Sequence, residues 1–246
     1  MNTYIISDIH GQVKLFHRMI KKINIDLSVD VLIIDGDILD RGQGSLKLFY
    51  EILQMQQEYG NDHVIIIKGN HEYFLSAFLK GNLPKSVYSS QGYGGTDTIR
   101  EVEELSDDEK KELIETIDSL PLYKTVFSEK RQEEIIVTHT GVHYEYIITN
   151  ANGTINVIKS IETAAEKDEF RFLINGYLQR ESPYSVIKSL DKTMIIGHVP
   201  TPFIADIEAP IITQLKGGKV ILIDCGAGHG EKLGCLRLED EAVFYE

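Results

Sequence analysis

Short apolar runs that end in charged or polar residues recur along this chain of 246 residues. Three of them lie at Tyr4–Ile6, Val31–Ile34 and Val64–Ile67, and an amphipathic or helix-like segment follows each one. Short apolar runs bounded in this way are typical of buried strands. Alternating strands and helices need crossover connections, which place successive strands parallel in one sheet. The pattern therefore predicts an α/β fold, at least in this part of the chain.

The segments between these runs predict helices. Apolar residues recur at helical spacing over 13–23, and we expect further helices over 45–59 and from 72 to about 79. Residues 81–95 are rich in glycine and polar residues, so they predict a loop. Ser106 and Glu109 have the spacing of a capping box, which predicts a polar helix that ends near Leu120.

The C-terminal half predicts further strands. Ile135–Val137 and Met194–Ile196 are apolar runs, with a helix expected between them from about Ala164 to Leu178. Two hairpins are expected, over 211–223 around a Gly-Gly turn and over 233–245. We therefore expect one domain over residues 1–246, with the fold class α/β: a four-layer-type sandwich of two mixed sheets flanked by helices.

The composition limits the cellular environment and the binding partners that can be expected for this protein. There are 25 Lys and Arg against 38 Asp and Glu, a formal net charge of −13, which argues against duplex nucleic acid and against a polybasic membrane anchor. No apolar stretch has membrane-spanning length, and no basic, apolar leader begins the chain. Only Cys225 and Cys235 are present, so reduced thiols and a cytoplasmic protein are expected. The acidic stretch 101–112 predicts a solvated helix face, with an insertion that touches substrate as the alternative.

Five of the predicted strands are followed by residues that bind metals or phosphate. Ligand sites of α/β sheets gather at the carboxyl ends of strands, so we expect these side chains to meet at one edge. Carboxylates and imidazoles without thiolates suit manganese, iron, zinc and related ions. The sequence therefore predicts a metal site at the strand ends, built from Asp8, His10, Asp37, Asn70, His139 and His198.

The motifs that carry these residues occur in a fixed order. They are Asp-Ile-His-Gly, Gly-Asp-Ile-Leu-Asp-Arg-Gly, Gly-Asn-His-Glu, His-Thr-Gly-Val and Gly-His-Val-Pro. In this order the chain resembles the calcineurin-like metallophosphoesterases, specifically the bacterial and phage branch of the serine/threonine phosphoprotein phosphatases. The resemblance extends from Asp8 to His198, which is most of the chain.

The resemblance implies a role for each residue. It implies two divalent ions, with manganese expected and iron, zinc, cobalt or nickel as alternatives, and a hydroxide between them that attacks phosphorus in line. His71 is then a general acid oriented by Asp40, and Arg41 binds the phosphate. The first ion is held by Asp8, His10 and Asp37, and the second by Asp37, Asn70, His139 and His198.

A second phosphate-binding arginine is expected downstream. Arg180 is our choice and Arg171 is the rival, although the family commonly has a tryptophan before this arginine and this chain has none. The segment 93–96 resembles the family's glycine-rich loop and is expected to shape the site. His143 is expected to lie outside the metal site, and His229, between two glycines, is expected to be a turn residue.

Three functions remain open from the sequence. The preferred one is a serine/threonine phosphatase that acts on phosphoproteins or phosphopeptides. The first alternative is a symmetrical dinucleoside tetraphosphate hydrolase, and the second is a non-catalytic phosphate-binding scaffold. Asp40 and Glu72 favour the phosphatase, whereas Gly44-Ser45 is shared with some of the tetraphosphate hydrolases. The oligomeric state is not indicated.

Overall fold

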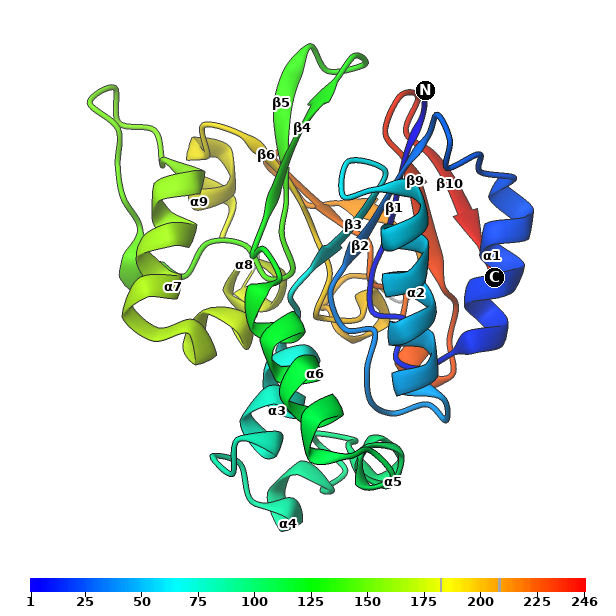
Figure 1. Cartoon of the computed structure of the whole chain (residues 1–246). Coiled ribbons are helices and arrows are strands. Elements are labelled where there is room, and N and C mark those ends of the chain that lie inside the picture. The colour runs from blue at the N-terminus through cyan, green and yellow to red at the C-terminus, as the bar shows by residue number, and fades with distance from the viewer. Residues whose placement is uncertain (182, 208) are drawn as a thin grey trace.

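The computed structural model describes residues 1–181, 183–207 and 209–246 and contains two five-stranded mixed sheets (Figure 1). The first sheet has the order β10-β9-β1-β2-β3, in which β1, β2 and β3 are parallel and β9 and β10 are antiparallel to their neighbours. Its strands are β1 (Thr3–Ile6), β2 (Val31–Asp35), β3 (Val64–Ile67), β9 (Gly234–Arg237) and β10 (Ala242–Tyr245).

The second sheet has the order β4-β5-β6-β8-β7. Here β5, β6 and β8 run parallel, and β4 and β7 are antiparallel edge strands. The predicted hairpins are confirmed, because β7 pairs with β8 and β9 pairs with β10. The strands are β4 (Lys124–Ser128), β5 (Glu133–Val137), β6 (Thr193–Ile196), β7 (Thr213–Gln214) and β8 (Val220–Leu222).

Helices cover the outer face of each sheet (Figure 1). Helices α1 and α2 pack on the first sheet and α7 to α9 on the second, while α3 to α6 form a group beneath them in this view. The helices are α1 (Val13–Ile23), α2 (Ser45–Tyr59), α3 (Asn70–Leu79), α4 (Lys85–Tyr88), α5 (Thr96–Glu103), α6 (Asp107–Ser119), α7 (Val157–Leu173), α8 (Tyr177–Glu181) and α9 (Tyr184–Ser189). Three short 3-10 turns lie at Tyr144–Tyr146, Thr201–Phe203 and Ala227–His229.

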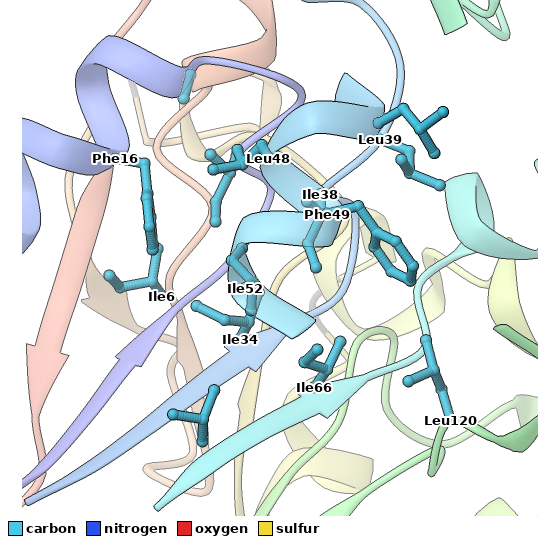
Figure 2. Close-up of a cluster of buried hydrophobic side chains, with 14 of the residues drawn as sticks. Ile6, Phe16, Ile34, Ile38, Leu39, Leu48, Phe49, Ile52, Ile66 and Leu120 are labelled. Carbon is cyan, nitrogen blue, oxygen red and sulfur yellow. The ribbon is translucent and has the colours of Figure 1, made fainter. Parts of the chain in front are cut away.

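Alternation along each strand builds three apolar layers. Ile6 and Ile34 point from the first sheet toward Phe16 of α1 and Phe49 of α2 (Figure 2). Their neighbours Ile5 and Ile33 point to the other side, where they meet residues of the second sheet. The expected sandwich of two mixed sheets flanked by helices is therefore confirmed.

Two local predictions were wrong. Residues 81–95 are not all loop, because α4 lies within them. The helix expected over 164–178 is instead the C-terminal part of α7 followed by α8. The break has a physical cause: the buried Asn175 side chain donates to the Val142 carbonyl and accepts from the Tyr177 N–H, which caps a new helix. The predicted capping box of α6 is confirmed, with Ser106 and Glu109 bonded reciprocally.

Helix α5 was not predicted, and it changes the interpretation of the acidic stretch 101–112. The Glu101 carboxylate accepts from the N–H groups of Gly44 and Leu46, at 2.9 and 2.7 Å. These groups lie at the start of α2, where N–H donors lack partners within the helix. Glu101 is therefore a cap for another helix, and the prediction of a solvated face was wrong at this residue.

Two structural facts bear on the composition arguments. Among the described residues, no helix combines the length and apolar character needed to cross a membrane. Cys225 and Cys235 are both buried and unpaired. The second fact agrees with the reduced thiols expected from the sequence.

Candidate active site

The polar residues that follow the strands adopt an unusual backbone conformation. Ten described residues other than glycine have positive φ, and six of them are predicted site residues. Non-glycine residues rarely adopt this conformation, and it persists only where the surrounding fold enforces it. Backbone strain is therefore concentrated at the predicted site, where the residues with positive φ are Asp8, His10, Asp37, Asp40, Arg41 and His198.

Glycines allow these loops to approach one another closely. A Cβ added at Gly69 would lie 2.3 Å from Asp37 Oδ1, and one added at Gly197 would lie 2.2 Å from Asp8 Oδ2. Both distances are below any real van der Waals contact, so only glycine fits. The two carboxylates are thus packed directly against the turns that lead to Asn70 and His198.

Two groups of side chains could each hold a metal ion, and Asp37 belongs to both. In one group the potential ligand atoms of His10, Asp37 and His71 lie within 4.8 Å of one another. In the other group the same holds for Asp37, His139 and His198. An aspartate shared in this way is what the sequence predicts for a residue that bridges two ions.

The hydrogen bonds of the histidines leave their lone pairs facing other acceptors. His10 Nδ1 donates to the Leu39 carbonyl, so its Nε2 faces Asp37 Oδ2 at 3.8 Å. His139 Nδ1 donates to the Asp35 carbonyl, so its Nε2 faces Asn70 Oδ1 at 3.1 Å. Acceptors that face acceptors in a buried site need a proton or a cation between them. The residues present therefore fit a metal centre.

The pKa shifts agree with this assignment. Burial lowers the pKa of His198 to about 3 and that of His10 well below its usual value, so both imidazoles are neutral at physiological pH, as metal binding requires. Although burial opposes it, His139 and His71 hold the pKa of Asp37 well below the usual range. Asp37 in turn raises the pKa of His139, against the effect of burial. A cation between Asp37 and His139 would take the place of that proton.

Asp8 lies beside the second group but is not one of its members. Its two carboxylate oxygens accept from the His198 N–H, at 3.2 and 3.1 Å. Burial raises its pKa to about 6. Its role as a metal ligand stays a prediction, whereas its position against His198 is a feature of the structure.

His71 and Asp40 form a fully buried pair. His71 Nδ1 lies 2.8 Å from Asp40 Oδ2, and the other oxygen of Asp40 accepts from the hydroxyls of Tyr88 and Thr98, both at 2.6 Å. Burial alone would lower the pKa of His71, but the carboxylates of Asp37 and Asp40 raise it above the usual value. A histidine oriented through Nδ1 presents Nε2 as a proton donor, which is the geometry of a general acid.

Arg41 is held from several sides. Its N–H donates to the Gly94 carbonyl, and its side chain passes so close to Gly94 that a Cβ there would lie 2.8 Å from Arg41 Cγ. Its Nη1 lies 2.7 Å from His229 Nε2, and burial lowers the pKa of His229, so the imidazole is a neutral acceptor. The glycine-rich loop thus shapes the site as expected. His229 does lie in a turn, but its ring faces the site, which the sequence did not indicate.

A cavity of about 810 Å³ opens over these groups. Arg180 lines it together with Arg41, whereas Arg171 is bound to Glu145 at 2.7 Å and does not line it. Between the two arginines considered from the sequence, the structure therefore favours Arg180. The cavity is also lined by Asp224, and its aromatic walls are Phe74, Tyr93 and Phe203.

Glu72 holds the loop that carries Asp37. Its buried carboxylate accepts from four backbone N–H groups: Asp37 at 2.8 Å, Ile38 at 2.9 Å, Leu39 at 3.3 Å and Gly69 at 2.9 Å. The sequence placed Glu72 in a motif without a role. The sequence signal for such a positioning residue was an acidic side chain two positions after the predicted ligand Asn70.

A comparison with protein-family models supports the assignment of this site independently of its geometry. The model of the calcineurin-like phosphoesterases matches residues 1–228. The chain belongs to the calcineurin-like phosphoesterase family. The family prediction made from the five motifs is therefore confirmed, and the histidine and aspartate groups are those of a metallophosphoesterase that could hold metal ions.

Curated relatives of this phosphoesterase include enzymes named for dinucleoside tetraphosphates. A symmetrical bis(5′-nucleosyl)-tetraphosphatase of Klebsiella pneumoniae (strain 342) is 25% identical over 179 residues, covering 72% of this chain and 55% of the relative. The asymmetrical enzyme PrpE of Bacillus subtilis (strain 168) is 32% identical over 153 residues, covering 58% and 59%. The chain thus spans little more than half the length of these curated relatives.

A solved structure shares the fold across the whole chain. It is a protein serine/threonine phosphatase from Saccharomyces cerevisiae with similarity to human phosphatase PP5. The TM-score is 0.63 with 15% identity, over 100% of this chain and 79% of that one. At this identity the similarity shows the fold alone.

Proposed function

We propose that this phosphoesterase hydrolyses dinucleoside tetraphosphates symmetrically. The observation that carries the proposal is the cavity of about 810 Å³, which is lined by two arginines and by aromatic side chains. Arginines bind phosphate oxygens through paired N–H donors, and aromatic rings stack on nucleobases. A dinucleotide with a polyphosphate bridge presents both kinds of group. The names of the two curated relatives support the same substrate class.

The protein groups divide the chemistry between them. His10, Asp37, Asn70, His139 and His198, with Asp8, would hold two divalent ions, and manganese is the first to test. Bound there, the ions would supply positive charge to the phosphate and activate the attacking water. Arg41 enters the reaction already oriented by Gly94 and His229, which limits the entropy lost when it binds a phosphate.

His71 acts on the leaving group. Its Nδ1 is fixed by Asp40, so the proton that it can give away lies on Nε2, which faces the Arg41 side of the cavity at 3.4 Å from Nη2. Protonation at that nitrogen stabilises a departing oxygen as the bond to phosphorus breaks. The raised pKa of His71 keeps this proton in place near neutral pH.

One observation favours a second function, the hydrolysis of phosphoserine and phosphothreonine in proteins. The His71–Asp40 pair is buried and reinforced by Tyr88 and Thr98, which is an elaborate arrangement for a general acid. A serine or threonine alkoxide is a poor leaving group and needs a proton, whereas a nucleoside diphosphate needs less assistance. Phosphoproteins or phosphopeptides therefore remain the rival substrates.

The deciding experiment measures turnover on both substrates with manganese present. Diadenosine tetraphosphate is followed by chromatographic separation of nucleotides, and a phosphothreonine peptide by phosphate release. We expect faster turnover of the dinucleotide with ADP as the sole product. AMP with ATP would indicate asymmetrical cleavage, and preference for the peptide would replace the proposal by the rival function. Fewer than one metal ion per two chains with no turnover would indicate a scaffold.

A further inference from the structure

A second cavity adjoins the first. Its volume is about 260 Å³, and Ile174 and Arg180 line both cavities. Its remaining walls come from the turn at residues 143–144, from Arg171 of α7, and from residues 175–177 and Glu181 at the two ends of α8. The second cavity is therefore an extension of the active site on the side of Arg180.

Aromatic rings dominate one wall of the second cavity. The His143 ring is stacked on the Tyr144 ring, with centroids 4.8 Å apart and an interplanar angle of 21°. The Tyr177 ring lies 5.6 Å from that of Tyr144. Tyr144 is 53% exposed, so part of this residue remains accessible to a ligand although His143 covers one face of its ring. Stacking on exposed aromatic faces is a general way to bind nucleobases.

The polar groups of the second cavity include an unused donor. His143 Nδ1 accepts from the Glu145 N–H, which places the ring proton of the neutral imidazole on Nε2. Within the described part of the chain, no partner is recorded for that Nε2. Purine and pyrimidine bases carry ring nitrogens and carbonyl oxygens that accept such a bond.

Arg180 connects the two cavities. Its guanidinium has no recorded hydrogen-bond or ion-pair partner within the described residues, whereas the nearby Arg171 is bound to Glu145. A cation at the junction is suited to a phosphate that joins a nucleoside in the second cavity to the reacting phosphate in the first.

We propose that the second cavity is a nucleobase subsite. It binds one base of a dinucleotide against Tyr144, with the adjoining phosphate on Arg180. The inference deepens the proposed function and rests on it, because a phosphopeptide has no base to place there. The stacked pair of His143 and Tyr144 and the free donor of His143 carry it independently of the metal site.

The test compares Tyr144→Ala with Tyr144→Phe, which keeps the aromatic ring. Tyr144→Ala should raise the KM for diadenosine tetraphosphate about tenfold, as expected for loss of base stacking, and Tyr144→Phe should leave it near the wild-type value. Neither should change kcat/KM for p-nitrophenyl phosphate, which has no base. Tyr184→Ala is the matched control, because Tyr184 is 55% exposed and lines neither cavity.

An inhibition measurement tests binding of a base in the second cavity separately from cleavage of the dinucleotide. AMP should inhibit p-nitrophenyl phosphate hydrolysis more strongly than inorganic phosphate does, and Tyr144→Ala should remove that advantage. If the wild type cleaves the dinucleotide but Tyr144→Ala has an unchanged KM and AMP inhibition, the subsite is overturned while the proposed function stands. If the wild type cleaves p-nitrophenyl phosphate but not the dinucleotide, the proposed function fails. If Tyr144→Ala raised the KM for the phosphothreonine peptide but not for the dinucleotide, the second cavity would be a peptide-binding site and the inference would be overturned.

Discussion

Replacement of Glu72 by Gln tests whether one buried carboxylate holds the metal loop in place. Each carboxylate oxygen accepts from two N–H groups: Oε2 from Asp37 and Gly69, and Oε1 from Ile38 and Leu39. Glutamine has the same shape but offers one oxygen and one NH₂ group. Two backbone donors would therefore lose their acceptor and face another donor in a fully buried site.

The magnitude follows from these contacts. Hydrogen bonds to a charged group contribute about 1.5–3 kcal/mol each, so the loss of two lowers the free energy of unfolding by about 3–6 kcal/mol. For a chain of this size, that corresponds to a fall in Tm of about 10 °C. Metal affinity should also fall by about 10–100-fold, because the displaced loop carries Asp37.

Glu101→Gln is the matched control. Glu101 also accepts from two backbone N–H groups, one on each oxygen, but it is only partly buried and lies at the start of α2. It should lose about 1 kcal/mol and retain wild-type metal affinity. Thermal denaturation in EDTA and metal titration of the refolded proteins measure both quantities. If Glu72→Gln is no less stable than Glu101→Gln and binds metal normally, the positioning role of Glu72 is refuted.

Four further substitutions probe the site. Asp37→Ala should abolish both turnover and metal loading, which elemental analysis measures. Near-normal activity would refute the prediction that Asp37 is shared by two metal ions. His71→Asn should retain the metals but lower kcat about 10²–10⁴-fold on a phosphothreonine peptide. The loss should be smaller on p-nitrophenyl phosphate, whose leaving group needs no proton. Equal losses on the two substrates would argue against His71 as the general acid. Asp40→Asn removes a charge that raises the pKa of His71, so the pKa of His71 should fall. In the pH–rate profile, the loss of activity on the alkaline side should then begin at a lower pH than in the wild type. His229→Ala should raise the KM several-fold by releasing Arg41, and His229→Gln, whose amide oxygen can accept, should restore it.

The sequence predicted the parts of the fold that depend on local patterns. Runs such as Tyr4–Ile6 and Val64–Ile67 are buried on both faces, so their apolar character identifies them without knowledge of the partner strand. The capping box at Ser106 is equally local. Helix α5 is different, because it is polar, short and stabilised by contacts with distant residues, among them the bond from Thr98 to Asp40. No window of the sequence contains that information.

The same distinction applies to the site. The order of the five motifs was enough to predict which side chains gather, since each follows a strand and strand ends meet at one edge. The preference for Arg180 over Arg171 depends on contacts between distant residues, because Arg180 lines the first cavity whereas Arg171 pairs with Glu145. His229 acts on Arg41 across 188 positions of the chain, so its neighbouring glycines indicated only a turn.

The strained backbone explains why site and fold depend on each other. Six predicted site residues have positive φ, a conformation that costs of order 1 kcal/mol or more for each non-glycine residue. Contacts that span the chain hold them there: the Gly94 carbonyl on Arg41, the Gly36 carbonyl on the Asp8 N–H, and Glu72 on the Asp37 loop. Divalent ions that bind the assembled ligands add stability only to the folded state. Metal loading should therefore stabilise the whole protein, and removal of one distant contact should weaken metal binding before it disturbs either sheet.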